Sequence, residues 1–181
     1  MVNAFKAIVV IFCMVLIFGI FPFYQYAKDL DDTTERVAHN ALIEFVDTVR
    51  GKGYVDVRDY EVFQSKLDDT GTIYDVTLEY YRKVLEPNYT NPYNINTFQG
   101  SFEVRYDGYY TNQILKVLYP NNNLPTDAVE RRLNMKVGDQ FNVRIEPKGT
   151  SLAAQISNAI FNVSSGISPD RYGGMVRSEA P

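Results

Sequence analysis

The sequence predicts an α+β protein in which a long N-terminal helix packs on a small antiparallel-sheet domain. Three observations predict this fold: an uncharged apolar run opens the chain, apolar residues at helical spacing follow it, and alternating apolar and polar residues recur in the remainder. We therefore expect three parts. Residues 1–27 form an apolar, membrane-spanning helix, residues 28–53 continue it as an amphipathic helix, and residues 54–181 form an α+β domain.

The apolar run is long enough to cross a membrane. Residues Ala7–Ala27, between Lys6 and Lys28, carry no charge. At 1.5 Å per helical residue, 18 to 21 residues cover about 27–32 Å, the thickness of a bilayer hydrocarbon core. A cleaved signal peptide is the alternative, but its apolar region is usually shorter, and Phe21 and Tyr24 stand where cleavage requires small residues. We expect an uncleaved anchor.

The charges that flank the run predict its orientation. Lys6 and the amino terminus precede it, whereas an excess of acidic residues follows it: Asp29, Asp31, Asp32 and Glu35 against Lys28 and Arg36. Positive charge favours the cytoplasmic side. We therefore expect a protein of the cell membrane with a cytoplasmic N-terminus and the bulk of the chain extracytoplasmic.

Beyond the membrane the pattern changes to a helix with one apolar face. The apolar residues are spaced by one, three and four positions: Val37, Ala38, Ala41, Leu42, Phe45, Val46 and Val49. Gly51 and Gly53 end this helix, and Gly19 and Pro22 are expected to kink or loosen it within the membrane. A second helix that starts at Asp29–Asp32 after a short break is the alternative to one continuous element.

The outer domain reads as a mixture of strands and short helices. The alternation in Ile73–Leu85 and Phe98–Tyr106 predicts strands, and Asp107-Gly108 is a hairpin signal. The other expected elements are an extended segment Tyr54–Val57, a helix Arg58–Leu67, loops at 86–97 and 119–125, a helix Asp127–Asn134 capped by Thr126, a strand Gln140–Glu146, a helix Leu152–Phe161 capped by Thr150, and a last strand at Met175-Val176.

Composition excludes several functional classes. The net charge of -4 and the lack of a basic tract argue against nucleic acid as a partner. A single cysteine, Cys13, and a single histidine, His39, exclude multi-cysteine metal sites and zinc sites with two histidines. The sequence also lacks the glycine-rich loops that hold phosphates. We expect no catalytic, cofactor-binding or metal-binding residues, and a protein that is not an enzyme.

Tyrosine is frequent, with 14 residues and no tryptophan. Tyrosines suit sheet faces and turns, and they also supply rigid amphipathic area for contact surfaces. The candidates for such a surface are Tyr89, Tyr93, Tyr109 and Tyr110. Cys13 is expected to be a small apolar residue of the membrane span, and Lys6 is either a topology signal or the partner of a carboxylate in an assembly.

A uniformly apolar N-terminal helix with Gly19 and Pro22, continued against an α+β domain, resembles the pilins and pseudopilins of the type IV filament superfamily. The stretches Tyr60–Tyr74, Gly138–Val143 and Gly173–Arg177 are similar to pilin-like envelope proteins of Gram-positive tight-adherence or conjugation loci. Two features depart from the family pattern. Phe and Lys occupy positions 5 and 6, where the family has an acidic residue nearby, and no leader ending in glycine stands ahead of the run unless it was removed before residue 1.

The resemblance implies a structural subunit of a surface filament or a secretion or conjugation apparatus, with no cofactor. Its partners would be membrane lipid before assembly, copies of itself through the N-terminal helix in the filament core, and assembly-platform proteins. The residues expected at helix–helix contacts are Lys6, Cys13, Gly19, Pro22 and Ala27. Two alternatives stay open: a single-span envelope protein whose outer domain binds a ligand or protein without polymerising, and an anchored enzyme.

Overall fold

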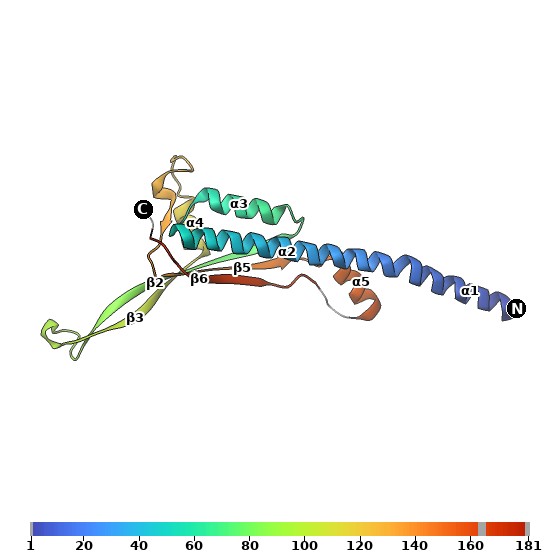
Figure 1. Cartoon of the computed structure of the whole chain (residues 1–181), viewed down its shortest axis with the longest axis horizontal. Helices are drawn as coiled ribbons and strands as arrows, with labels where there is room; N and C mark the ends of the chain where they lie inside the picture. The colour runs from blue at the N-terminus through green and yellow to red at the C-terminus, as the bar shows by residue number, and fades with distance from the viewer. Residues whose placement is uncertain (1, 163–165, 180–181) are drawn as a thin grey trace.

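The chain forms a head from which a long helix extends (Figure 1). The computed structural model describes residues 2–162 and 166–179. The long helix consists of α1 (Val2–Val15), a π-helical turn (Leu16–Ile20) and α2 (Phe21–Lys52). Helical backbone therefore runs from the apolar start into the head. The expected continuous helix is confirmed, and the alternative of a second helix starting at Asp29–Asp32 is wrong.

The π-helical turn lies where Gly19 and Pro22 predict that the helix loosens. The backbone N–H of Phe21 donates to the carbonyl of Leu16, five residues back instead of four. Pro22 has no N–H, so the carbonyl of Phe18 lacks its ordinary α-helical donor. The wider turn is thus a consequence of the proline just after it.

The outer half of α2 packs its apolar stripe against the head. Of the expected stripe, these residues are buried: Ala38, Ala41, Leu42, Phe45, Val46 and Val49. Val37 departs from the expectation because it lies at the edge of the stripe and is 43% exposed. Gly53 ends the helix in the left-handed conformation, with φ of 78° and its N–H donating to Val49.

The head is a four-stranded antiparallel sheet in the order β3-β2-β5-β6, flanked by helices. The strands are β2 (Ile73–Tyr89), β3 (Phe98–Tyr110), β5 (Gln140–Lys148) and β6 (Asp170–Met175). A second pair consists of β1 (Tyr54–Val55) and β4 (Leu133–Asn134). The remaining helices are α3 (Val57–Asp68), α4 (Thr111–Leu118) and α5 (Leu152–Phe161).

The core lies between one face of the sheet and the helices α2 and α3. The ring of Phe45 on α2 stacks on Phe63 of α3 at 4.6 Å and meets Phe141 of β5 edge-on at 6.0 Å. Leu78 and Tyr80 of β2 face the same core, as their alternation predicts. Three elements that are distant in sequence are therefore joined through one aromatic cluster.

The expected hairpin at Asp107-Gly108 is wrong. Asp107 pairs with Arg82 and Gly108 pairs with Tyr81, so β3 continues through both residues. The turn instead occupies residues 90–97, where Thr97 Oγ1 donates to the carbonyls of Asn91 and Asn94. Gly108 does not adopt the positive φ that a tight hairpin turn requires. Residues 86–89, expected in a loop, belong to β2.

The helices after β3 also differ from expectation. The expected helix Asp127–Asn134 is replaced by a 3₁₀ turn (Val129–Arg131) and the short strand β4. Pairing of β4 with β1 supplies backbone hydrogen bonds that a helix there would forgo. A helix that the sequence analysis missed, α4, follows β3 directly.

The helix Leu152–Phe161 is confirmed as α5, with a different cap. Its N-cap is Ser151, whose Oγ accepts from the N–H of Ala154 at 3.1 Å, and not the neighbouring Thr150. The last strand is β6, which ends at Met175, so Val176 lies just beyond it and is buried.

Candidate functional site: an exposed apolar rod and an amphipathic arm

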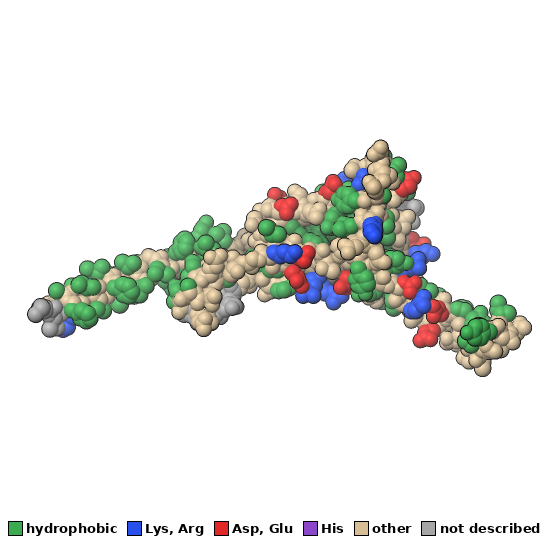
Figure 2. All heavy atoms as spheres, turned by 180° about the vertical axis from the view of Figure 1, so that it is seen from behind, with side chains coloured by type: hydrophobic (Ala, Val, Ile, Leu, Met, Phe, Trp, Pro, Cys, Tyr) green, Lys and Arg blue, Asp and Glu red, His purple; other side chains and the backbone are tan. Residues whose placement is uncertain are grey.

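The N-terminal half of the long helix has no cover from the rest of the chain. Every residue from 3 to 23 is exposed, and we call this segment the apolar rod. Phe18, for example, is 76% exposed and Phe5 is 68% exposed. Helix Asn3–Lys52 contains an 18-residue window that is apolar enough to cross a membrane and entirely unburied. Figure 2 shows the green hydrophobic side chains along the rod, while most charged side chains gather on the head and the adjoining hairpin.

Four of the five residues expected at helix–helix contacts lie on the apolar rod. Lys6 and Cys13 are exposed on α1, Gly19 lies in the π-helical turn, and Pro22 is exposed at the start of α2. A Cβ atom added to Gly19 would meet nothing within 4 Å. Ala27 differs, because it is only 2% exposed within the single chain.

A second exposed feature is a two-stranded arm. The pairing between β2 and β5 ends at Tyr81 and Gln140, whereas β2 and β3 stay paired to Tyr89 and Phe98. The segment Arg82–Asp107, which we call the arm, therefore projects from the sheet as a ribbon of two strands (Figure 1). It points away from the end of the molecule that carries the apolar rod.

The arm has one apolar and one charged face. Residues that pair directly across two antiparallel strands share a face. The register therefore places one cation, Lys83, and a row of apolar residues on one face: Leu85, Pro87, Tyr89, Phe98, Phe102, Val104 and Tyr106. Phe102 is 59% exposed and Leu85 is 58% exposed. Ring centroids of Phe98 and Phe102 lie 5.4 Å apart.

The opposite face of the arm carries a chain of ion pairs. Arg105 contacts Glu86 at 2.9 Å and Asp107 at 3.2 Å, and Arg82 contacts Asp107 at 3.4 Å. These charges satisfy one another on the ribbon itself. The apolar face is therefore the side of the arm that is left for contact with another molecule.

The four candidate tyrosines fall into two groups. Tyr89 lies on the apolar face of the arm, 5.8 Å from the ring of Phe98, and Tyr93 in the turn is 99% exposed. Tyr109 and Tyr110 lie at the base of the arm. Tyr109 is half-buried and stacks on Tyr80, while Tyr110 is 54% exposed.

Sequence reasoning missed the phenylalanines and aliphatic residues that accompany these tyrosines. The signal was the alternation of Phe102, Val104 and Tyr106, which predicts a strand with one apolar face. Alternation does not tell whether that face meets the core or solvent. Here it meets solvent, since the core under α2 and α3 includes none of these arm residues, and Leu85, Phe102 and Val104 are all exposed.

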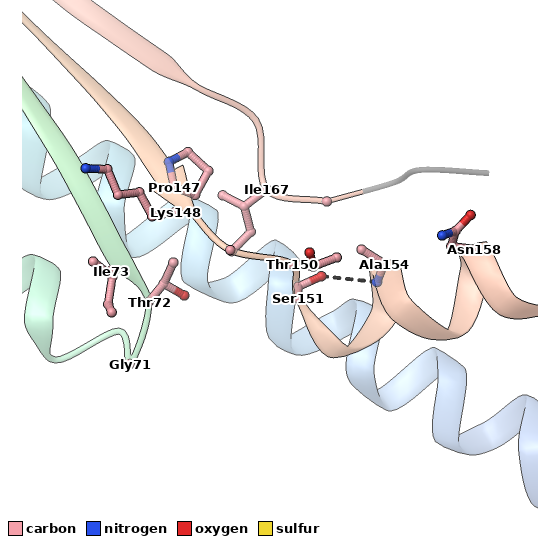
Figure 3. A pocket seen from close by; sticks show the side chains of 12 residues that line it. Gly71, Thr72, Ile73, Pro147, Lys148, Thr150, Ser151, Ala154, Asn158 and Ile167 are labelled. Carbon is pink, nitrogen blue, oxygen red and sulfur yellow. Dashed lines mark hydrogen bonds between the residues drawn. The ribbon is translucent and has the colours of Figure 1, made fainter. Parts of the chain in front are cut away.

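A half-open cavity of about 490 Å³ lies between the start of β2, the end of β5 and α5 (Figure 3). Its lining offers the hydroxyl groups of Thr72, Thr150 and Ser151 and one cation, Lys148. Lys148 Nζ lies 3.2 Å from Asp75, and Ser151 Oγ donates to Asp31 at 2.5 Å. Among the described lining residues there is neither a carboxylate nor an imidazole.

His39 serves as a link between α2 and β6. Its Nδ1 lies 2.6 Å from Asp170 Oδ2 at the start of that strand. Within residues 2–162 and 166–179, no three His, Cys, Asp or Glu side chains form a group that fits a metal ion.

Two tyrosine hydroxyls near the arm base have a raised pKa. Burial, and then the neighbouring Glu79, raise the pKa of Tyr81 above its ordinary value. Burial also raises the pKa of Tyr80, and its hydrogen bond to Asp139 adds to this. Both hydroxyls donate within the chain, that of Tyr80 to Asp139 and that of Tyr81 to Glu79.

No protein-family model, no curated protein and no solved structure matches this sequence and fold.

Proposed function

We propose that this protein is a membrane-anchored, pilin-like structural subunit that assembles through its N-terminal helix into a surface filament or a secretion or conjugation apparatus. The observation that carries the proposal is the apolar rod, which exposes hydrophobic side chains on all sides and continues without a break into a packed head. Water is an unfavourable environment for such a surface. The rod requires lipid, or other rods, around its whole circumference.

The same surface suits both environments. Lipid tails are as apolar as the rod, so association of rods depends on close packing and not on an additional hydrophobic gain. Gly19 favours such packing, because its exposed backbone has free space around it in the single chain. Movement from membrane to filament would therefore exchange lipid contacts for helix contacts.

The flanking charges support a cytoplasmic N-terminus and an extracytoplasmic head. Lys6 precedes the run, and Asp29, Asp31 and Asp32 follow it. In this orientation the arm projects from the head on the side away from the membrane. Its apolar face would then be available to a neighbouring subunit in the same assembly.

Replacement of Gly19 by leucine tests the proposal. Gly19→Leu adds bulk where the single chain has open space, so the head is expected to stay folded while packing between rods is lost. Gly51→Leu is the matched control, because Gly51 is also helical and also has nothing within 4 Å of its Cβ position. The measurement is the amount of each variant in sheared surface filaments and in the membrane fraction.

We expect Gly19→Leu to remain in the membrane and to be depleted from filaments, with Gly51→Leu unchanged. Equal recovery of both variants in filaments would contradict packing at Gly19. If the wild-type protein is absent from every sheared fibre and stays a monomer in detergent, the assembly proposal fails.

A second candidate function is a single-span envelope protein whose head binds a protein partner without polymerising. The amphipathic arm favours this candidate, because its apolar face suits contact with a second protein. The same fractionation separates the two, since a non-polymerising protein stays with the membrane whatever residue occupies position 19.

A further inference from the structure

Helix α5 is tied to the long helix at the point where the apolar run ends. Ser151, its N-cap, donates through Oγ to Asp31 Oδ2 at 2.5 Å. Ala27, one turn closer to the apolar rod, is buried, and α5 contacts α2 (Figures 1 and 3). The small side chains of Ala153, Ala154 and Ser157, all 4% exposed, form the packed side of α5.

The sequence around α5 carries no charge. Residues Gly149–Pro169 contain no Asp, Glu, Lys, Arg or His, and this stretch of 21 residues matches the length of the uncharged run Ala7–Ala27. Charged residues return on both sides of it, with Lys148 at the end of β5 and Asp170 at the start of β6. In the part of this stretch that the structure describes, the chain leaves β5 and forms α5 against α2.

The side of α5 that does not pack on α2 carries exposed Leu152 and Ile160 next to exposed Gln155 and Asn158, while Ile156 is half-buried. Leu152, Ile156 and Ile160 are spaced four residues apart and so lie along one stripe. Leu152 is 53% exposed and Ile160 is 52% exposed. These side chains have room for an apolar partner.

The level of α5 along the long helix coincides with a membrane surface. If the hydrocarbon core begins at Ala7, 20 helical residues cross about 30 Å and reach Tyr26. Ala27 to Asp31 then lie in the headgroup layer, which is about 5–7 Å thick on each side. The exposed side chain of Tyr26 at the same level suits this interface.

We infer that α5 is a second lipid contact, an interfacial helix that rests on the outer leaflet with Leu152 and Ile160 at the boundary between headgroups and acyl chains. This inference rests on the proposed membrane anchoring of the rod. Apolar side chains and a lack of charge suit this boundary. Because the stretch lacks cations, the contact requires no anionic lipid. It sets the tilt of the head on the membrane, and it must be released when a subunit leaves the bilayer.

The absence of tryptophan from the chain allows a direct test. Ile160→Trp in the full-length protein is reconstituted into phosphatidylcholine vesicles that contain lipids brominated near the headgroup or near the chain end. Phe18→Trp reports on the rod, and Val129→Trp reports on an exposed part of the head that is outside the uncharged stretch. Leu152→Trp is a second reporter on α5 in case Ile160→Trp does not fold.

The expected result is that shallow bromine quenches Ile160→Trp by about twofold or more, as for a side chain at the acyl boundary, while Val129→Trp is not quenched. Phe18→Trp is quenched mainly by deep bromine. Replacement of a third of the lipid by an anionic phospholipid leaves the Ile160→Trp signal unchanged.

Two results would overturn the inference and leave the anchor intact. One is quenching of Phe18→Trp while Ile160→Trp and Leu152→Trp behave like Val129→Trp. The other is fluorescence of the Ile160→Trp variant that is shielded from both brominated lipid and aqueous acrylamide, which means that protein covers α5. If Phe18→Trp also escapes quenching, the proposed anchoring fails and the inference fails with it.

Discussion

Tyr80 donates its hydroxyl hydrogen bond to Asp139 Oδ2 at 2.7 Å, and this pair locks the base of the arm to the turn before β5. Asp139 is 1% exposed and also accepts from the backbone N–H groups of Lys83 and Lys136, each at 2.8 Å. Its own backbone carbonyl accepts from Val176. The buried carboxylate of Asp139 thus joins β2 to the turn before β5, and the backbone carbonyl of the same residue holds the segment after β6.

Replacement of Asp139 by asparagine is expected to destabilise the head strongly. The amide keeps one acceptor oxygen but turns an NH₂ group towards donors, so buried donors lose their partner, at about 2–4 kcal/mol of unfolding free energy. Urea unfolding of the detergent-solubilised chain measures this. Asp75→Asn is the control, since Asp75 is exposed and pairs with Lys148 at the surface, and it is expected to change stability by less than about 1 kcal/mol. Equal losses of unfolding free energy in the two variants would contradict a stabilising role for the hydrogen bonds of Asp139.

The stability of the head is expected to fall at alkaline pH. Burial, followed by the hydrogen bond to Asp139 and the charge of that residue, raises the pKa of Tyr80 above its ordinary value of 10.0. The unfolded chain therefore loses this proton near pH 10 while the folded chain keeps it. The stabilisation is complete below pH 10 and is lost as the pH rises towards the folded-state pKa, at up to about 1.4 kcal/mol per pH unit for one group.

The variant Tyr80→Phe isolates this contribution. It starts from a lower stability, because Asp139 loses a donor, but its unfolding free energy is expected to fall less steeply between pH 9 and 11, since one fewer raised tyrosine contributes to the slope. Urea unfolding at a series of pH values gives both slopes. If the unfolding free energy falls with the same slope in wild type and variant, Tyr80 is not a source of the pH dependence.

Truncation of Phe45 is expected to detach the long helix from the head. Phe45 is 4% exposed and contacts both Phe63 and Phe141, so Phe45→Ala leaves a cavity among three elements. The expected loss is about 3–5 kcal/mol. Val37→Ala on the same helix, at a position 43% exposed, is expected to cost less than about 1 kcal/mol. Thermal unfolding followed by near-ultraviolet circular dichroism measures the loss of stability in the two variants.

Gly173 is expected to tolerate no side chain. A Cβ there would lie 1.9 Å from Asn142 Oδ1 and 2.8 Å from the Cα of the same residue, its partner across β5 and β6. Gly173→Ala should therefore separate the edge strand and lower stability by about 1–3 kcal/mol. Gly51→Ala, in an open helical position, should instead raise stability by about 0.5–1 kcal/mol. Thermal melts that shift in the same direction would contradict this account.

Replacement of Phe102 by serine tests the apolar face of the arm. Burial of a phenylalanine contributes about 1.5–3 kcal/mol, so Phe102→Ser is expected to weaken association of the protein by about ten- to hundredfold while the head stays folded. Glu103→Gln changes the neighbouring residue on the opposite face and is expected to have little effect. Sedimentation of the two variants in detergent over a concentration series measures this. Equal association would show that the apolar face is not used.

The strand β3 was predicted from its alternation, but the position of its turn was not. Alternation at Phe102, Val104 and Tyr106 predicted the strand, and the structure confirms it, but the strand runs on through Asp107 and Gly108, which were expected to turn. A dipeptide turn signal is local and weak. Cross-strand pairing with Arg82 and Tyr81 is more favourable, and this depends on residues about 25 positions away.

The sequence by itself determined the apolar rod, its continuation as an amphipathic helix, and the strand and helix character of most of the head. These properties depend on amino-acid composition and on the spacing of apolar residues, with a period of two in strands and 3.6 in helices. Both can be read from residues that are close together in the sequence. Only the tertiary structure decided that β5 begins at Gln140 and leaves the arm without a third strand, that Asp139 is buried under Tyr80, and that α5 lies beside Ala27. Those outcomes depend on strand register and on which apolar surfaces pack together. Both are set by contacts between residues far apart in the chain.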